Sequence, residues 1–326
     1  MIGTLKIFAG NANRPLARDI CKKAGIPVGK MDIIKFSNEN VKVAIKESVR
    51  GCDIFVIQPS CSPVSENIVE LLIMLDALKD ASAGRITVVA PYYPYVRSDK
   101  KDEPRISITA RLMADLMETA GANRILTMNL HSPQIQGFFR INCDHLDAGN
   151  LLVKYFLENV DLHNTVVVAP DAGATKRTVK YAERMNLPMA ILDKRRKDDS
   201  EAARVYHIIG EVKGKNVIIF DDEISTAGTM VEVVDALKNA AVKDIRIACV
   251  HGVFCGPAID RLRKANIKEI VTTDTVYIPK RKRLRNMTVL SVAEPLAEAI
   301  RRTHNNESIG EIFKANRRDE RAAGME

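Results

Sequence analysis

The fold is decided by the stretch Val217-Ile218-Ile219-Phe220-Asp221-Asp222-Glu223-Ile224-Ser225-Thr226-Ala227-Gly228-Thr229-Met230. Its four apolar residues predict a buried strand, and two carboxylates, Asp221 and Asp222, stand where that strand is expected to end. A helix is predicted next from apolar residues at helical spacing, which are Met230, Val233, Val234 and Leu237. The stretch therefore predicts a strand, an acidic corner, a loop of small residues and a helix.

A corner of this kind suits a sugar phosphate. The loop offers small residues and hydroxyl groups, and it consists of Ser225, Thr226, Ala227, Gly228 and Thr229. Small residues let the backbone approach a phosphate closely, and the first amides of the helix have no partner within it. The two carboxylates can accept hydrogen bonds from vicinal hydroxyl groups of a sugar. The alternative is an ordinary strand-to-helix turn in which aspartate and serine cap the helix.

The length and composition of the chain predict a globular protein of two domains. At 326 residues it exceeds one small core, so two domains of roughly 150 residues each are expected. Hydrophobic residues make up 46% and charged residues 28%, which argues against a disordered class. The formal net charge is +8, and basic residues cluster at 97–101, 194–197 and 280–285 without interleaved aromatics. A polyphosphate is favoured over nucleic acid.

The sequence gives no sign of a membrane segment or of a disulfide framework. Its longest apolar runs, such as residues 71–75, are far shorter than the roughly 20 residues needed to cross a bilayer, and no signal-peptide pattern is present. The 6 cysteines are scattered and include no CxxC pair, as expected for reduced thiols. We therefore expect a cytoplasmic protein without a membrane partner.

Predicted strands alternate with predicted helices, which indicates parallel sheets. In the first half, strands are expected at residues 5–8, 31–36, 52–58, 85–90 and 124–130, and helices at 15–24, 68–79 and 108–120. In the second half, strands are expected at 165–169, 189–192, 205–212, 217–220, 246–251 and 269–273, and helices at 151–159, 176–185 and 257–265. The fold class is α/β, with two doubly wound domains at 1–148 and 149–313 and a disordered tail at 314–326.

Several segments resemble the ribose-phosphate diphosphokinase family, whose members are phosphoribosyl diphosphate synthases. They include Asn129-Leu130-His131-Ser132-Pro133-Gln134-Ile135-Gln136-Gly137-Phe138-Phe139 and Val167-Val168-Ala169-Pro170-Asp171-Ala172-Gly173-Ala174-Thr175-Lys176-Arg177. The likeness extends from residue 5 to about residue 313. The corner at 221–229 is similar to the phosphoribosyl-diphosphate signature of type I phosphoribosyltransferases, although Ser225 stands where many members carry an acidic residue. Each domain is therefore expected to have that fold.

The resemblance implies a reaction and the residues that carry it. Family members transfer the β,γ-diphosphoryl group of ATP to the C1 hydroxyl of ribose 5-phosphate, with Mg²⁺ bound to the nucleotide. By resemblance, His131 and Asp171 hold the magnesium ion, and the corner at 221–229 binds ribose 5-phosphate. Lys194 and Arg196 would stabilise charge on the transferred group from a loop that closes over the site.

ATP binding is also implied by resemblance. The family's ATP-gripping loop matches Arg97, Ser98, Asp99, Lys100 and Lys101. An aromatic that packs on adenine matches Phe36, with Asn38 and Asn40 beside it. Ser98 replaces a glutamine, and Asn38-Glu39-Asn40 replaces an Asp-Gly-Glu run of well-known members, so the preferred nucleotide is left open.

Family members assemble into rings built from dimers, so a homo-oligomer of dimers forming a hexamer is expected. Two other functions stay open. A non-catalytic paralogue would bind the same ligands and regulate a partner enzyme, but the expected metal and cationic residues are all present. A phosphoribosyltransferase would use the corner at 221–229 and leave the first half unexplained.

Overall fold

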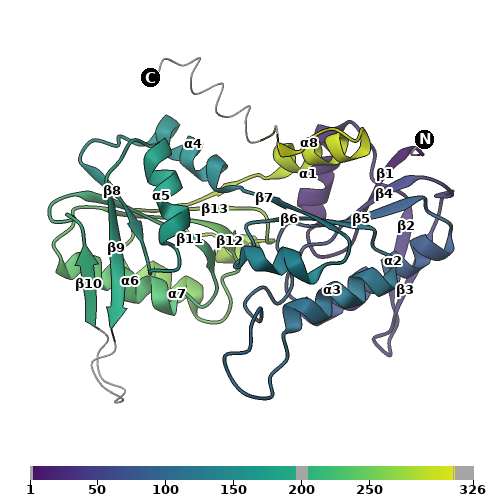
Figure 1. Ribbon diagram of the computed structural model, residues 1–326, viewed down its shortest axis with the longest axis horizontal. Helices are drawn as coiled ribbons and strands as arrows, with labels where there is room; N and C mark the ends of the chain where they lie inside the picture. The colour runs from purple at the N-terminus through teal and green to yellow at the C-terminus, as the bar shows by residue number, and fades with distance from the viewer. Residues whose placement is uncertain (1–2, 196–204, 311, 313–326) are drawn as a thin grey trace. The chain divides into compact units, whose positions relative to one another are not determined.

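The computed structural model describes residues 3–195, 205–310 and 312. The chain forms two compact units: unit 1 comprises Met1–Leu146 and Ser291–Glu326, and unit 2 comprises Asp147–Leu290. Each unit has a central parallel sheet with helices on both faces (Figure 1). The predicted α/β class with central parallel sheets is therefore confirmed. None of the helices in the described part of the chain is long and apolar enough to span a bilayer.

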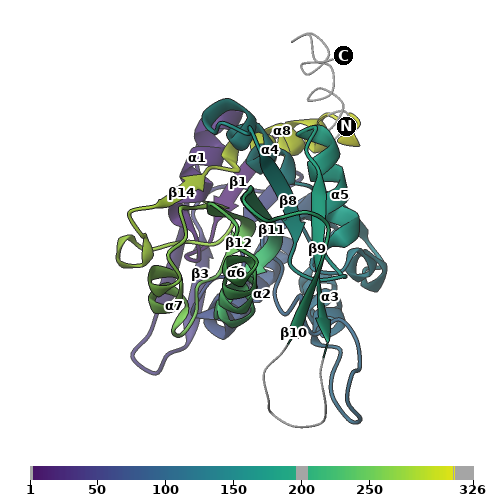
Figure 2. The same ribbon diagram turned by 90° about the vertical axis from the view of Figure 1, so that its left-hand side faces the viewer.

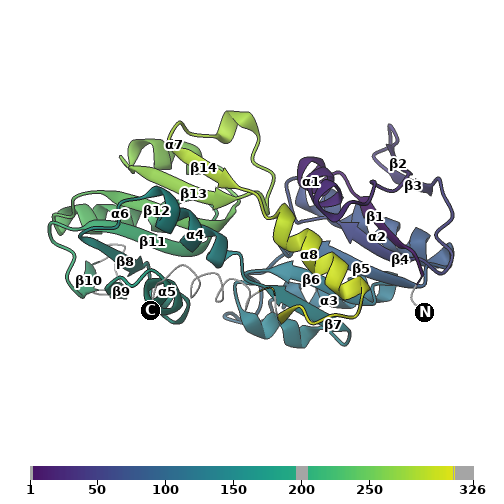
Figure 3. The same ribbon diagram turned by 90° about the horizontal axis from the view of Figure 1, so that it is seen from above.

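Unit 1 contains a five-stranded parallel sheet in the order β1-β4-β5-β6-β7. Its strands are β1 (Leu5–Ala9), β4 (Asp53–Ile57), β5 (Arg85–Ala90), β6 (Arg124–Met128) and β7 (Asn142–Leu146). Its helices are α1 (Arg14–Ala24), α2 (Val64–Asp80), α3 (Thr109–Ala120), the 3-10 helix η1 (Pro133–Phe138) and α8 (Ala293–His304). In Figures 1 and 3, α1 and α8 lie together on one face, and α2 packs with α3 on the other.

The core of unit 1 follows the two-residue period of its strands. Ile54 and Val56 of β4, with Ile86 and Val88 of β5, pack against the apolar faces of α2 and α3. Side chains at alternate positions of a strand point to one face of the sheet. Because β4 is buried at all five positions, both faces of the sheet need a helical cover, as expected for a parallel sheet.

The second predicted strand of unit 1 lies outside the main sheet. β2 (Met31–Lys35) pairs antiparallel with β3 (Val41–Ile45) in a separate hairpin, which projects from the sheet in Figures 1 and 3. No residue of β2 is fully buried, so this strand lacks the two apolar faces of an internal parallel strand. A single parallel bridge, Ile7 with Val28, marks where the chain passes β1 before the hairpin begins.

Unit 2 contains a seven-stranded sheet in the order β10-β9-β8-β11-β12-β13-β14, parallel except for the β10–β9 pair. Its strands are β8 (Thr165–Ala169), β9 (Met189–Arg195), β10 (Val205–Ile209), β11 (Asn216–Ile224), β12 (Ile245–Gly252), β13 (Glu269–Thr273) and β14 (Met287–Leu290). Its helices are α4 (Gly149–Asn159), α5 (Thr175–Arg184), α6 (Gly228–Asn239), α7 (Ala258–Lys264) and the 3-10 helix η2 (Lys280–Lys282). Figure 2 shows α4 and α5 on one side of this sheet and α6 and α7 on the other.

Four strand ends differ from the prediction by two residues or more, and one of them is β10, which ends at Ile209 instead of residue 212. β11 runs through both carboxylates to Ile224, because its pairing with β12 continues to Gly252. β9 reaches Arg195 instead of residue 192, because β10 pairs with it as far as that residue. β6 ends at Met128 instead of residue 130.

Six elements of the described chain were not predicted: β3, β7, β14, α8 and the 3-10 helices η1 and η2. The first unit boundary, between Leu146 and Asp147, lies within two residues of the predicted limit at 148, but the predicted second domain at 149–313 differs from the packing, since residues from Ser291 onward group with unit 1. The reason is α8, which packs against α1. The tail at 314–326, expected to be disordered, lies outside the described residues.

Candidate active site

The corner at 221–229 lies where the strand order of unit 2 reverses. From β8 the chain places β9 on one side, whereas β11, β12 and β13 follow on the other side. The β8–β11 ladder stops at Ile219 paired with Val168, while β11 continues beside β12 for five more residues. The carboxyl ends of β8 and β11 therefore separate. In open parallel sheets, ligands bind at such a switch point.

The loop at 225–229 offers unpaired amides to that edge. Ala227 is buried and has a φ of 59°, a left-handed conformation that turns the chain into α6. In the part of the chain that the structure describes, the N–H groups of Thr226, Ala227, Gly228 and Thr229 contact no hydrogen-bond acceptor. Amides of this kind at a helix start bind phosphate well, because the helix dipole adds to them.

The two predicted carboxylates form a cluster with an arginine that the sequence did not single out. Nη2 of Arg177 lies 3.0 Å from Oδ1 of Asp222 and 3.9 Å from Oδ1 of Asp221. Burial, followed by the neighbouring charge of Asp222, raises the pKa of Asp221 well above its ordinary value, and Arg177 opposes this rise. Arg177 comes from the first turn of α5, so only folding brings it to β11. The one signal in the sequence was its place at the end of the segment 167–177, which carries the family resemblance.

Asp171 lies at the same edge of the sheet. It follows the end of β8 by two residues, and its Oδ1 accepts the Ala174 N–H at 2.8 Å, which fixes the turn into α5. Since β8 and β11 are parallel neighbours, Asp171 and the loop at 225–229 follow the carboxyl ends of adjacent strands. Among the described residues, no group of three or more His, Cys, Asp or Glu side chains gathers as a ready-made metal site.

Of the two predicted catalytic cations, Lys194 belongs to the β9–β10 hairpin. Lys194 lies within β9, where its backbone pairs with Tyr206 of β10. It is three residues beyond Ile191, the partner of Ala169 at the end of β8, so it belongs to the same sheet edge. The prediction placed Lys194 in a loop, and the longer β9 corrects this. Arg196 lies outside the described residues.

His131 belongs to unit 1. It follows β6 by three residues and is exposed at the start of the turn into η1. The preceding residue, Leu130, is buried, and its N–H donates to Nε2 of His145 at 2.9 Å. This contact fixes the backbone that carries His131. Its predicted meeting with Asp171 in one cleft stays a prediction.

The predicted ATP residues lie in two loops of unit 1. Phe36 and Asn40 close the β2–β3 turn through the Phe36 N–H and the Asn40 carbonyl, 2.8 Å apart, and Phe36 is 48% exposed. Asn38 belongs to the same turn and accepts the Asn40 N–H through Oδ1 at 3.2 Å. The residues at 97–101 form an irregular segment between β5 and α3, in which the Ser98 N–H bonds to the Tyr95 carbonyl at 2.9 Å. The Phe36 ring is accessible to a stacking partner, and its contact with adenine stays a prediction.

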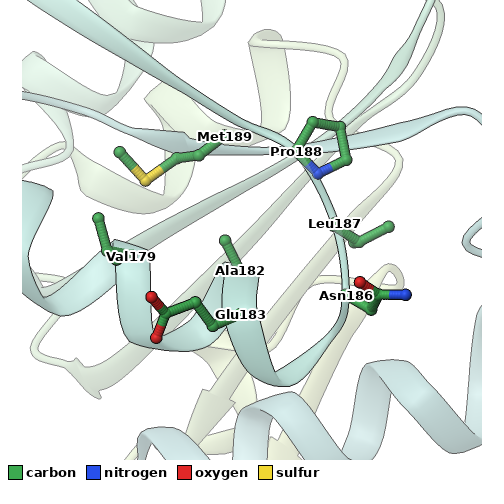
Figure 4. A pocket seen from close by; sticks show the side chains of 7 residues that line it. All are labelled: Val179, Ala182, Glu183, Asn186, Leu187, Pro188 and Met189. Atoms are coloured by element: carbon green, nitrogen blue, oxygen red, sulfur yellow. The ribbon is translucent and has the colours of Figure 1, made fainter.

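A cavity of about 460 Å³ lies elsewhere in unit 2. Figure 4 shows its lining, which comes from the end of α5 and the residues entering β9: Val179, Ala182, Glu183, Asn186, Leu187, Pro188 and Met189. Met189 is the first residue of β9, so this cavity lies at the amino ends of the strands. No predicted site residue lines it.

Comparison with known proteins identifies a family for both units of the chain. A family model described as the N-terminal domain of ribose phosphate pyrophosphokinase matches residues 5–121, and one described as the phosphoribosyl transferase domain matches residues 145–285. Ribose-phosphate pyrophosphokinase of Clostridium acetobutylicum is 50% identical over 311 residues, covering 95% of this chain and 97% of that protein. The corresponding protein of Clostridium perfringens is 46% identical over 312 residues, with coverage of 95% and 98%.

A solved structure is similar along the same length. The phosphoribosylpyrophosphate synthetase of Mycobacterium smegmatis matches with a TM-score of 0.88 and 41% identity, covering 93% of this chain and 99% of that one. Identity at this level over nearly the whole of each chain shows common descent rather than a shared fold alone. The chain belongs to the ribose-phosphate pyrophosphokinase family.

Proposed function

We propose that this protein transfers the β,γ-diphosphoryl group of ATP to the C1 hydroxyl of ribose 5-phosphate, giving phosphoribosyl diphosphate and AMP. The observation that carries the proposal is the corner of unit 2, where a carboxylate pair precedes four amides without acceptors among the described residues. The amides suit the 5-phosphate, and the carboxylates suit the ribose hydroxyls. Family membership supplies the reaction class.

The chemistry is a displacement at the β-phosphorus of ATP. The C1 oxygen of the sugar attacks that phosphorus, the bond to the oxygen bridging the α- and β-phosphates breaks, and AMP leaves. Such transfers need in-line positioning and neutralisation of charge on the phosphates. Lys194, at the carboxyl end of β9, and Arg196 after it would neutralise that charge.

Magnesium fits the donors that the chain offers. One oxygen of Asp171 holds the Ala174 N–H, so the other oxygen is the one that a cation would take. His131 would supply an imidazole nitrogen, while phosphate oxygens and water would supply the rest. Bound magnesium would neutralise triphosphate charge. The proposal also includes ATP as the nucleotide donor, assembly into a homo-oligomer and a cytoplasmic location.

The test is a phosphorus NMR time course with ATP, ribose 5-phosphate and Mg²⁺. We expect AMP and a diphosphate on ribose C1 for the wild type, and a rate at least about 100-fold lower for Lys194→Ala, because a transition-state cation is lost. Lys180→Ala removes an exposed lysine of α5 and should keep the wild-type rate. Absence of turnover with ATP would overturn the assignment of ATP as the donor. Turnover with GTP or CTP instead would indicate that Asn38, Asn40 and Ser98 have changed the nucleotide preference.

The main competing function is a regulatory paralogue without activity. It predicts binding of ribose 5-phosphate without product from any nucleotide. The retained Lys194 and Asp171 favour the enzyme over this alternative.

A further inference from the structure

The segment after β12 holds the backbone that leads into the sugar-phosphate loop at residues 225–229. The carbonyl oxygen of Ile224 accepts the Phe254 N–H at 3.0 Å, and the carbonyl oxygen of Ser225 accepts the Cys255 N–H at 3.0 Å. Both carbonyls therefore point toward the start of α7. Phe254 is fully buried, so this anchor is part of the core of unit 2.

The next carbonyl is held by a side chain. Nη1 of Arg261, in α7, donates to the carbonyl oxygen of Thr226 at 2.9 Å. The C=O and N–H groups of a trans peptide point in opposite directions. A Thr226 carbonyl that points toward α7 therefore turns the N–H of Ala227 away from α7. That N–H is one of the four amides that have no acceptor within the described residues.

The charge of Arg261 lies beside the same loop. A Cβ atom placed on Gly228, the first residue of α6, would lie 3.5 Å from Nη1 of Arg261. The start of a helix already carries partial positive charge, so a guanidinium there is unfavourable until an anion binds. A phosphate bound by the amides would offset this repulsion through its negative charge, while the guanidinium keeps its hydrogen bond to the Thr226 carbonyl.

We propose that Arg261 is a positioning residue for ribose 5-phosphate. By holding the Thr226 carbonyl, it orients the amides of residues 226–229 toward the 5-phosphate, and its charge favours the bound anion. This role rests on the proposed function, in which the loop at 225–229 binds that phosphate. Arg261 is exposed, so its contact with the loop, rather than core packing, explains its position.

The test separates the sugar phosphate from the nucleotide. Arg261→Ala should raise the KM for ribose 5-phosphate about tenfold or more, because a charge-assisted hydrogen bond and the loop geometry are lost. The KM for ATP and the thermal unfolding midpoint should stay near the wild-type values. Arg261→Lys, which keeps the charge without the fork geometry, should give a smaller increase. Calorimetric titration with ribose 5-phosphate alone should show the same ranking.

Arg263→Ala is the matched control. Arg263 lies on the same helix, and its Nη1 pairs with Asp260 at 2.6 Å, away from the loop. This variant changes the net charge equally and should leave the KM for ribose 5-phosphate within about twofold, as is usual for an exposed ion pair. An increase equal to that of Arg261→Ala would show a general charge effect and overturn the proposal.

Thr229→Val distinguishes failure of this proposal from failure of the site. If Thr229→Val raises the KM for ribose 5-phosphate and Arg261→Ala does not, the loop binds phosphate and the role of Arg261 is wrong. If neither variant changes it while product still forms, the loop is not the phosphate site, and both proposals are overturned.

Discussion

The two units share the order of their parallel strands but differ in the place of an antiparallel hairpin. Unit 1 has the order β1-β4-β5-β6-β7, and unit 2 repeats it as β8-β11-β12-β13-β14. In each unit an antiparallel hairpin follows the first strand, β2–β3 in one and β9–β10 in the other. In unit 2 this hairpin belongs to the sheet, whereas in unit 1 it forms a separate one. The edges to compare are the carboxyl ends of β1 and β4 in unit 1 and of β8 and β11 in unit 2, and among the described residues only unit 2 has a further strand of its sheet on the other side of the first strand.

In unit 1, side chains of the protein fill that edge. Gln58, which follows β4, is 3% exposed; its Nε2 donates to the Asn67 carbonyl at 3.1 Å and to Glu70 at 2.8 Å, and its Oε1 accepts the Ala12 N–H at 3.1 Å. A Cβ on Gly10 would lie 2.3 Å from Oε1 of Gln58, so only glycine leaves room for this amide. In unit 1, hydrogen bonds within the protein therefore pair the polar groups at this edge of the sheet. Unit 2 leaves amides without acceptors among its described residues.

The helix that packs beside the first helix of each sheet comes from a different part of the chain in the two units. In unit 2, α4 precedes β8 and packs on α5, whereas in unit 1 the helix that packs on α1 is α8, from the other end of the chain. The side chain of Asp53, fully buried at the start of β4, receives two hydrogen bonds from Arg85 and lies 2.8 Å from Nδ1 of His304. Arg85 also donates to the Thr303 carbonyl at 3.0 Å. These contacts tie α8 to the sheet of unit 1.

The largest effect is expected at the open edge. Asp222→Asn should lower kcat/KM for ribose 5-phosphate at least about 100-fold, because it removes the charged acceptor for a sugar hydroxyl and the partner of Arg177. Asp235→Asn, at an exposed position of α6, is the control with the same change in charge. Unchanged kinetics of Asp222→Asn would remove the distinction between the two edges.

The second variant changes the closed edge. Gln58→Leu should lower the free energy of unfolding by about 2 kcal/mol, because the Ala12 N–H and Glu70 lose a buried partner. Its KM for ribose 5-phosphate should stay near the wild-type value. Chemical denaturation and steady-state kinetics measure the two quantities. A large rise in KM with unchanged stability would indicate that unit 1 holds a ligand at this edge.

The third variant weakens the attachment of α8. His304→Ala should lower the stability of unit 1 by about 1 kcal/mol, the usual value of one hydrogen bond. Differential scanning calorimetry beside His163→Ala, an exposed histidine of unit 2, would measure it. Equal shifts for the two variants would contradict a specific role of the contact with Asp53.

The smallest expected effect is a pH dependence of stability. Because the pKa of Asp221 is raised in the folded protein, the folded state binds more protons than the unfolded chain between the ordinary aspartate pKa, about 3.9, and the raised value. The contribution is full below that window and is lost as the pH rises through the raised pKa. The Tm of Asp221→Asn minus that of the wild type should therefore increase with pH. A difference that is constant with pH would contradict the raised pKa.

The sequence predicted most of the internal strands because they are continuous apolar runs. β8 and β11 are examples, each with at least four consecutive buried residues. The edge strand β7, Asn142-Cys143-Asp144-His145-Leu146, carries polar residues and is mostly half-buried, so no apolar run marked it. The place of α8 depends on a contact between Arg85 and Thr303, which are 218 residues apart. Local patterns carry no information on such a contact.

The candidate site was predictable only in part for the same reason. The carboxylates and the loop at 225–229 are consecutive, so one stretch displayed them together. Arg177 and Arg261 come from α5 and α7 and meet that stretch only after folding. The end of β11 was misplaced because it depends on β12, which extends the pairing past the two carboxylates.

The central claim is that the amides of unit 2, and not the matching edge of unit 1, bind the sugar phosphate. The most direct measurement is an amide NMR titration with ribose 5-phosphate of protein labelled with nitrogen-15 at its 17 glycines. Loss of one signal in Gly228→Ala assigns Gly228, and triple-resonance experiments on a sample that also carries carbon-13 assign Gly10, where a side chain would clash with Gln58. The account predicts a large downfield shift at Gly228 and none at Gly10. A shift at Gly10 with Gly228 unchanged would contradict it.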